Sequence, residues 1–227
     1  MTGGRTDAHR MQNAALGLLF QETLSGHFAL GQTDPEAGGQ IGERAGHTLS
    51  VRALVHIADM TRFVSDPDYA AAVSGQIDLP ALGKSVSILA GAFSLPCAPW
   101  PNLARQIFYV LPLEHAGKDY TLIGRQAIPK APGLDPWRET TMLPVRLHEG
   151  QGGEGRVLGA GILRASMTER MNLASTLRVL HPQSSEEERR TLLRFGAFFL
   201  GELWNRCAGA SAPSAPGGRA ASLVECI

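Results

Sequence analysis

The stretch "LLFQETLSGHFAL" (residues 18–30) decides the fold class, because apolar residues recur at every second position along it. Successive side chains of a β-strand point to opposite faces of the sheet, so one face of this stretch carries a mostly apolar set. That set comprises Phe20, Glu22, Leu24, Gly26, Phe28 and Leu30. We therefore predict a strand with one buried face.

Similar alternation predicts at least seven further strands, at residues 49–58, 72–79, 85–95, 106–114, 119–128, 140–148 and 156–165. Turn-forming segments separate them, among them "TDPEAGGQ" (residues 33–40) and "HAGKD" (residues 115–119), which we interpret as a hairpin turn. Parallel pairing needs long crossovers, so short turns favour antiparallel pairing. The sequence predicts a mainly β protein built as an antiparallel barrel or sandwich.

A short motif occurs twice, as "LSGHFAL" (residues 24–30) and "LAGAFSL" (residues 89–95). This echo leaves two architectures open, a single barrel or two half-barrels related by a duplication. Glycine inside a strand marks a bulge, a bend, or the close approach of a backbone or ligand. Two interpretations of Gly26 and Gly91 follow: a neighbouring aromatic ring fills the space beside each glycine, or a ligand does.

Short helices are expected over residues 59–66 and 166–175, with Asp59 and Ser166 as N-caps. An amphipathic C-terminal helix begins near Ser184, where either Ser184 with Glu187 or Ser185 with Glu188 has the spacing of a capping box. Phe198 falls outside its apolar stripe. We expect residues 14–207 to form one β-rich domain, and residues 1–13 and 208–227 to be flexible.

The composition argues against several classes of function. Lys plus Arg and Asp plus Glu each number 21, so there is no basic excess for nucleic acid or anionic membranes. The three cysteines are odd in number and widely spaced, which fits a reducing compartment. No segment has a secretory pattern or approaches the roughly 20 apolar residues of a membrane span. We expect a cytoplasmic protein without a membrane span.

Glu22 is the main polar anomaly, because it lies on the apolar face of the first strand. A buried carboxylate must be paired, hydrogen-bonded or protonated, and a protonated one can act as an acid. The simpler interpretation is a structural salt bridge to Arg52, Arg125 or Arg164. Trp137, in the loop "GLDPWRETTML" (residues 133–143), either lines a pocket mouth or plugs the barrel end.

Other chemistry finds no support in the motifs. The seven histidines show no HxH or HExxH spacing, so we expect no metal site. There is no GxSxG nucleophile motif, and "GEGRVLGAGIL" (residues 153–163) lacks the ending of a phosphate-binding loop. We expect no cofactor.

A string of short motifs resembles a known family: "LLFQETLSGHF", "VHIADMTRFVSDPDYAAAVSGQI", "VSILAGAFSL", "YTLIGRQAI", "GLDPWRETTMLPVRL", "GILRASMTERMNLASTLRV" and "RFGAFFLGELW". Together they are similar to an accessory β-rich domain that accompanies GMC-type (cholesterol-oxidase-like) oxidoreductases in large bacterial proteins. Arg125 departs from that pattern, which has lysine after the glycine. The oxidoreductase part, with its GxGxxG flavin fingerprint, is not in this sequence. The resemblance implies an association with the oxidation of sterol-like or other lipidic alcohols.

The function we expect is a non-catalytic module that binds an apolar small molecule or lipid, or that docks on a lipid- or sterol-type oxidoreductase or a hydrolase. Its expected ligand-binding residues are Glu22, Gly26, Phe28, Gly91, Phe93, Arg125 and Trp137. Two alternatives remain open. One is a small barrel enzyme, an isomerase, cyclase or hydrolase, with Glu22 as acid or base. The other is a structural partner whose exposed Phe198 and loop aromatics form a protein interface.

Overall fold

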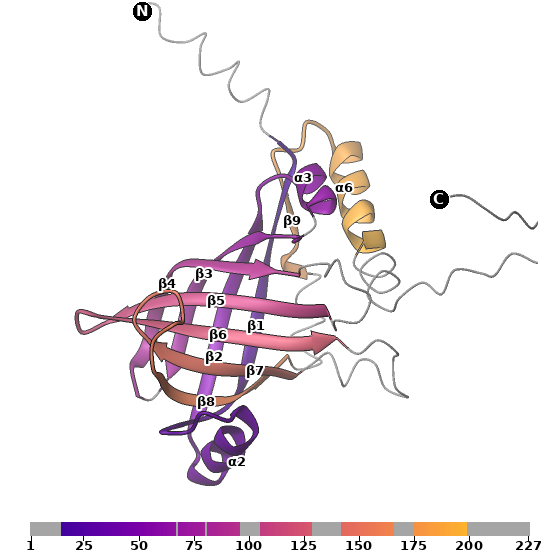
Figure 1. Ribbon diagram of the computed structural model, residues 1–227. Coiled ribbons are helices and arrows are strands. Elements are labelled where there is room, and N and C mark those ends of the chain that lie inside the picture. Colours follow the sequence, from indigo (N-terminus) through magenta and orange to yellow (C-terminus); the bar gives the residue numbers. More distant parts are fainter. Residues whose placement is uncertain are drawn as a thin grey trace, which may run out of the picture.

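A computed structural model describes residues 15–66, 68–79, 81–95, 105–128, 142–165 and 175–198 (Figure 1). The strands are β1 (Gly17–Leu30), β2 (Thr48–Ile57), β3 (Ala71–Leu79), β4 (Gly83–Ser94), β5 (Arg105–His115), β6 (Lys118–Ile128), β7 (Met142–Glu149), β8 (Val157–Arg164) and β9 (Arg178–Leu180). The helices are α2 (Pro35–Ala45), α3 (Met60–Ser65) and α6 (Ser185–Ala197). In this part of the chain, no helix is long and apolar enough to cross a bilayer.

Strands β1 to β8 form one closed antiparallel barrel, in which each strand pairs with the next in sequence. Strand β1 closes it by pairing with β2 on one side and β8 on the other. The prediction of a mainly β antiparallel barrel is confirmed, and the architecture is a single barrel, not two half-barrels. All eight predicted strands are present within a few residues of their expected bounds.

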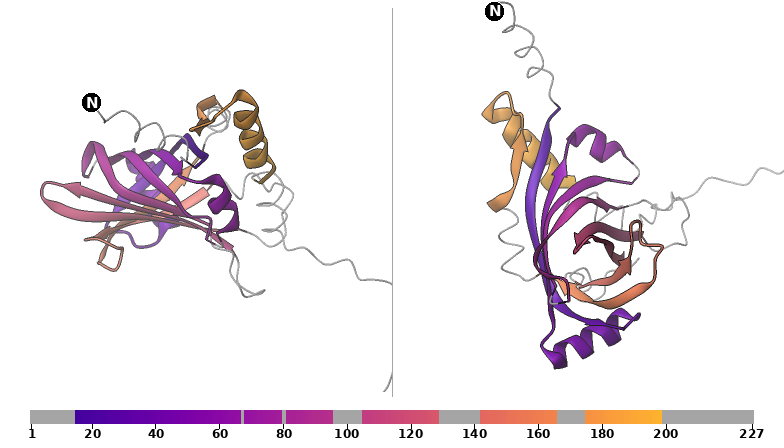
Figure 2. Two further views of the ribbon diagram at one scale, coloured as in Figure 1. Left: turned by 90° about the horizontal axis from the view of Figure 1, so that it is seen from above. Right: turned by 90° about the vertical axis from the view of Figure 1, so that its left-hand side faces the viewer.

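Strand β1 is long enough, at 14 residues, to serve three partners. It runs the whole height of the molecule, from β9 and α6 at one end to α2 at the other (Figures 1 and 2). Gly17–Leu19 pair with β9, residues 18–27 pair with β2, and residues 25–30 pair with β8. The strand therefore ties the barrel to the elements at both of its ends.

The two glycines of the repeated motif let backbones approach closely. A Cβ atom at Gly26 would clash with the carbonyl oxygen of Ile162 on β8, and one at Gly91 would lie 2.8 Å from the carbonyl oxygen of Val73 on β3. The prediction that an aromatic ring fills the space beside each glycine is therefore wrong. Neighbouring strand backbone occupies that space at Gly26, and strand backbone together with the Ile88 and Leu111 side chains occupies it at Gly91.

Apolar side chains from all eight barrel strands form one contiguous core. Aromatic rings cover the end of the barrel near α3 and α6, where Phe198 lies 5.6 Å from Phe63 and 5.0 Å from Tyr69, ring centre to ring centre. Phe195 lies 5.8 Å from Phe20 on β1. Phe198 is only 4% exposed, so the expectation of an exposed Phe198 at an interface is wrong. It packs α6 onto the barrel instead.

The predicted helix starts are confirmed at α3 and α6. The Asp59 carboxylate accepts hydrogen bonds from the backbone N–H groups of Thr61 and Arg62. At α6 the N-cap is Ser184, whose hydroxyl accepts from the Glu187 N–H at 3.2 Å. This resolves the two capping alternatives in favour of Ser184 with Glu187. Nearly all of the helix predicted over residues 166–175 lies outside the described residues.

Helix α2 replaces a predicted turn, "TDPEAGGQ". Asp34 caps it by accepting from the Ala37 N–H at 2.8 Å, and Pro35 occupies its first turn. Glycine destabilises an isolated helix, but here it allows the helix to pack closely on the strands beneath it. A Cβ at Gly38 would clash with the Ala160 carbonyl of β8, and one at Gly42 would lie 2.5 Å from the Phe28 nitrogen of β1. Tertiary packing therefore outweighs the low helix propensity of glycine.

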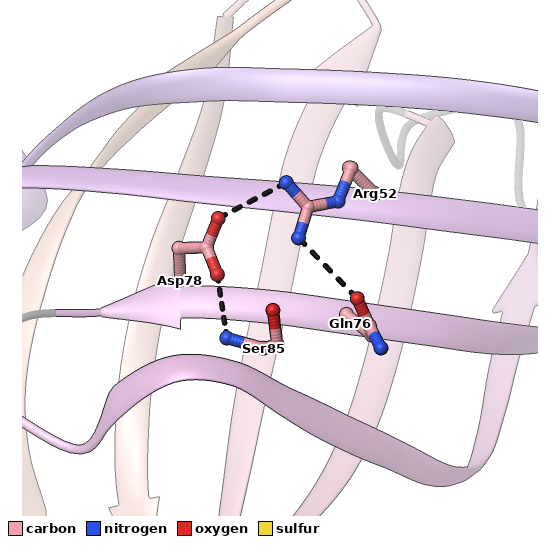
Figure 3. A network of polar contacts seen from close by, with 4 residues as sticks. All are labelled: Arg52, Gln76, Asp78 and Ser85. Carbon is pink, nitrogen blue, oxygen red and sulfur yellow. Dashed lines mark hydrogen bonds and ion pairs between the residues drawn. The ribbon is translucent and has the colours of Figure 1, made fainter.

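Two hairpins show why the strands turn where they do. Between β5 and β6, Ala116 and Gly117 both have positive φ, at 51° and 70°, as a two-residue hairpin turn requires, so the predicted "HAGKD" hairpin is confirmed. Between β3 and β4, Asp78 accepts from the Ser85 N–H at 2.6 Å and from Arg52 on β2 at 3.1 Å (Figure 3). This network fastens three neighbouring strands on the outer face of the barrel.

Candidate functional site

Glu22 lies on the interior face of β1, between two buried neighbours on that face, Phe20 and Leu24. Across the β1–β2 ladder its partner is Ala53, which is also buried. The Glu22 side chain itself is half-buried. A carboxylate thus projects into an otherwise apolar part of the barrel, as the alternation of residues 18–30 predicted.

Tyr109 of β5 meets this carboxylate from another strand. The Tyr109 hydroxyl donates a hydrogen bond to Glu22 Oε2 at 2.6 Å, and Tyr109 is 7% exposed. The bond joins residues 87 positions apart in the sequence. We refer to these two side chains as the Glu22–Tyr109 pair.

None of the three arginines considered as partners for Glu22 is bound to it. Arg52 pairs with Asp78 on the outside of the barrel. Arg125 is exposed, and its guanidinium lies 5.0 Å from the centre of the Phe108 ring. Arg164 is exposed at the end of β8. The predicted salt bridge to one of these three arginines is therefore wrong, and Glu22 accepts a hydrogen bond from the Tyr109 phenol.

The surroundings of Tyr109 raise the pKa of its hydroxyl and so favour the protonated form. Burial in the barrel raises its pKa well above the usual value, and the negative charge of Glu22 and the hydrogen bond to it act in the same direction. Tyr109 is therefore a neutral donor across the physiological range. A short bond from a phenol to a carboxylate is charge-assisted, so it is stronger than a bond between neutral groups.

Aromatic and aliphatic side chains enclose the pair. The Phe93 ring of β4 meets the Tyr109 ring edge-on, with centres 5.2 Å apart and an interplanar angle of 63°. Gly124 of β6 is the ladder partner of Tyr109, and a Cβ there would lie 2.8 Å from the Leu143 side chain. Gly124 thus leaves room for Leu143 beside the phenol. The structure brings Phe93, a predicted ligand-binding residue, into the same group as Glu22.

The other predicted ligand-binding residues lie elsewhere. Phe28 is 2% exposed, and its ring packs against Gly159 of β8. Gly26 and Gly91 contact strand backbone, and Arg125 is on the outer face. Trp137 lies outside the described residues. Of the six predicted positions that the structure describes, only Glu22 and Phe93 join the group around Tyr109.

Sequence reasoning missed Tyr109, although a signal for it exists. In "FYVLPL" (residues 108–113), Tyr109 shares a face with Leu111 and Leu113, which predicts a buried phenol. A buried tyrosine hydroxyl usually finds a hydrogen-bond partner, and the sequence places Glu22 as a hydrogen-bond acceptor on the apolar face of another strand. Matching these two requirements would have predicted the pair.

Two further buried polar side chains lie on β6. Gln126 is 6% exposed and lies two residues beyond Gly124, on the same interior face. Thr121 is fully buried, but its hydroxyl donates to the Gly150 carbonyl at 2.8 Å and so secures the loop after β7. Gln126 therefore adds a polar group to the interior, whereas Thr121 is structural.

The site combines a closed antiparallel barrel, an apolar interior and one acid–phenol pair within it. Among the described residues, no three His, Cys, Asp or Glu side chains are grouped closely enough to hold a metal ion. The chain has no match among protein-family models, curated proteins or solved structures. Functional inference therefore depends on the chemistry of the site itself.

Proposed function

We propose that the protein binds a small, mainly apolar molecule that carries a hydroxyl or amine, with the Glu22–Tyr109 pair holding the polar group. The observation that carries the proposal is the 2.6 Å hydrogen bond between Tyr109 and Glu22 inside an apolar barrel. Small-molecule sites are mostly apolar, with a few polar groups that fix the orientation of the ligand. Eight-stranded barrels are wide enough to hold one small ligand.

The carboxylate has the acceptor capacity that such a ligand needs. An ionised carboxylate offers about four lone-pair positions, and one phenol O–H occupies one of them. Glu22 is half-buried, so part of its side chain remains accessible to a ligand hydroxyl or ammonium. Tyr109 fixes the carboxylate in one orientation before the ligand arrives, which reduces the ordering cost of binding.

The resemblance to the accessory domain of GMC-type oxidoreductases extends this proposal. It supports a lipidic or sterol-like alcohol as the ligand class, and an oxidoreductase or hydrolase as a partner on which the barrel docks. An alcohol donates to a carboxylate as the site requires. We place this binding function in the cytoplasm, consistent with the odd number and wide spacing of the three cysteines.

One observation favours a second candidate, a small barrel enzyme such as an isomerase, cyclase or hydrolase. Two titratable groups lie within hydrogen-bond reach of each other, which is the arrangement that proton transfer requires. Glu22 would act as the acid or base, and Tyr109 would position it. In this case Glu22→Gln abolishes turnover of the bound molecule and leaves its binding largely intact.

The experiment is native mass spectrometry of the purified protein, together with analysis of an organic extract of the same sample. We expect one bound molecule of mainly apolar character with at least one hydroxyl or amine, and its loss from Glu22→Gln. If the protein is purified empty, the same measurement follows incubation with decanol. Protein that is empty and takes up no decanol would contradict the proposal. Conversion of the extracted molecule by wild-type protein would favour the enzyme.

A further inference from the structure

A crevice on the outer face of the barrel lies apart from the Glu22–Tyr109 pair. It has a volume of about 190 Å³ and lies between helix α2 and the strands β1, β7 and β8. Figure 1 shows α2 lying beside β8 at the opposite end of the molecule from α6. An apolar cavity of about 150 Å³ holds a molecule the size of benzene. The crevice therefore has room for a small organic ligand.

The crevice walls carry charges of both signs. Glu36, Gln40 and Glu43 line it from α2, with spacings of four and three residues that place them along one stripe of the helix. Arg164 lines it from β8, and His27 lines it from β1. In the described part of the chain, the ion pairs all lie elsewhere, so neither glutamate pairs with Arg164.

Unpaired opposite charges around one small space complement a ligand that carries both charges itself. A ligand ammonium suits the carboxylates of Glu36 and Glu43, and a ligand carboxylate suits the Arg164 guanidinium, which binds carboxylates through two parallel N–H groups. Ile162, which is 8% exposed, and Met142 give the crevice an apolar part. A short methylene chain between the two charged groups would contact these side chains.

Gly39 provides an independent argument. Glycine inside a helix is destabilising relative to alanine, and close packing explains it at Gly38 and Gly42. At Gly39 a Cβ would lie 3.5 Å from Ile162 Cγ1, an ordinary contact distance, so packing does not require glycine there. Gly39 and Ile162 both line the crevice, and a methyl group between them would take up part of its volume. The effect of glycine at this position is to keep the crevice open.

We infer that this crevice is a binding site for a small zwitterion of the amino-acid type, with an ammonium group and a carboxylate joined by a short aliphatic chain. Glu36 and Glu43 bind the ammonium, and Arg164 binds the carboxylate. The site is separate from the interior pair, because Glu22 faces the inside of the barrel and the crevice is on its outside. This inference is thus independent of the ligand proposed for the interior.

The test is a titration of isotope-labelled protein, followed by backbone amide NMR, with glycine, γ-aminobutyrate and aminohexanoate as zwitterions of increasing length. Butylamine and butyrate, which carry one charge each, are the matched ligands. The variants are Arg164→Gln and Gly39→Ala, and Arg189→Gln on the exposed face of α6 is the matched control. All three positions tolerate the change in space, since both arginines are exposed and the Gly39 Cβ makes only ordinary contacts.

We expect at least one zwitterion to give saturable shifts at Gly39, Gln40 and Ile162, and to bind more tightly than butylamine or butyrate. Arg164→Gln weakens this binding by about tenfold, because a hydrogen bond to a charged group is worth about that factor. Gly39→Ala also weakens it without lowering the melting temperature, and Arg189→Gln leaves it unchanged. The inference is overturned if no zwitterion gives saturable shifts there. It is equally overturned if butylamine binds as tightly and Arg164→Gln has no effect.

Discussion

Replacing Tyr109 by phenylalanine tests the energetic role of the Glu22–Tyr109 pair. The substitution removes one hydroxyl and keeps the ring that packs edge-on against Phe93 at 5.2 Å. A hydrogen bond to a charged group contributes about 1.5–3 kcal/mol, and the substitution removes the one that Tyr109 donates to Glu22. Because Glu22 is half-buried, water replaces part of that bond, so we expect a loss of about 1.5–2 kcal/mol in the free energy of unfolding.

The assay is equilibrium unfolding in urea at neutral pH, with Tyr120→Phe as the matched control. Tyr120 is half-buried on β6, and no hydrogen bond of its hydroxyl is found among the described residues. We expect the control to change the free energy of unfolding by less than about 0.5 kcal/mol. Equal stability of Tyr109→Phe and wild type would refute the reasoning.

Tyr109→Phe should also change how the free energy of unfolding depends on pH in the alkaline range. Burial raises the pKa of Tyr109 in the folded protein, whereas the unfolded chain ionises near the usual value of about 10. Below about pH 10 the contribution of Tyr109 to the free energy of unfolding is fully present. Above that pH the unfolded state loses the tyrosine proton before the folded state does, so the stability of the wild type falls as pH rises. Tyr109→Phe removes this contribution and gives a shallower decline. Parallel declines of the two proteins above about pH 10 would show that Tyr109 is not held neutral by the fold.

Three further predictions concern the fold, each measured by urea unfolding. Gly42→Ala destabilises the protein by about 1–3 kcal/mol, because the added Cβ would lie 2.5 Å from strand backbone. Gly39→Ala instead stabilises it by about 0.5–1 kcal/mol, because the added Cβ makes only ordinary contacts. Equal effects of the two substitutions would contradict the packing described for α2. Asp78→Ala costs about 1–2 kcal/mol, because the Ser85 N–H and Arg52 both donate to it, and no loss would mean that the hairpin holds without this network. Phe198→Ala lowers the free energy of unfolding by about 3–5 kcal/mol, because this side chain is buried. The control Leu193→Ala lowers it by less than about 0.5 kcal/mol, because Leu193 is 66% exposed. Equally small losses for both variants would show that α6 is not packed on the barrel as described.

The strands were predictable because the alternation of apolar and polar residues at every second position identifies each of them. Residues 18–30 alternate strictly enough that the burial of Leu18, Leu24 and Phe28 follows from their spacing alone. The hairpin at residues 115–118 was predictable for a similar local reason, since Ala-Gly between two alternating runs suits a two-residue turn. Local pattern and global fold agree in these segments.

Helix α2 was not predictable, because its glycines oppose a helix locally. Gly38 and Gly42 have low helix propensity, and only the backbone of β8 and β1 beneath them makes small residues favourable there. Phe198 was misjudged for the opposite reason. A helical stripe drawn from the α6 sequence alone does not include the second surface, formed by Phe63 and Tyr69, that buries this ring.

The candidate site was predictable only in part. Glu22 is conspicuous in the sequence as a carboxylate on an apolar face, but its partner depends on the curvature of the closed sheet. Tyr109 is four strands away from Glu22 along the chain, and no spacing rule connects the two residues. The arginines considered instead are separated from Glu22 because they lie on the outer face of the barrel or at its end.

The most direct test of the central claim, that a ligand is held by the interior pair, is to observe both side chains while a ligand binds. The measurement is carbon-detected NMR of the Glu22 carboxyl carbon and the Tyr109 ring during a titration with decanol. We predict that both signals shift together and saturate, and that Glu22→Gln abolishes the response of the Tyr109 ring. Signals that remain unchanged at both side chains, with or without binding elsewhere on the protein, would contradict the claim.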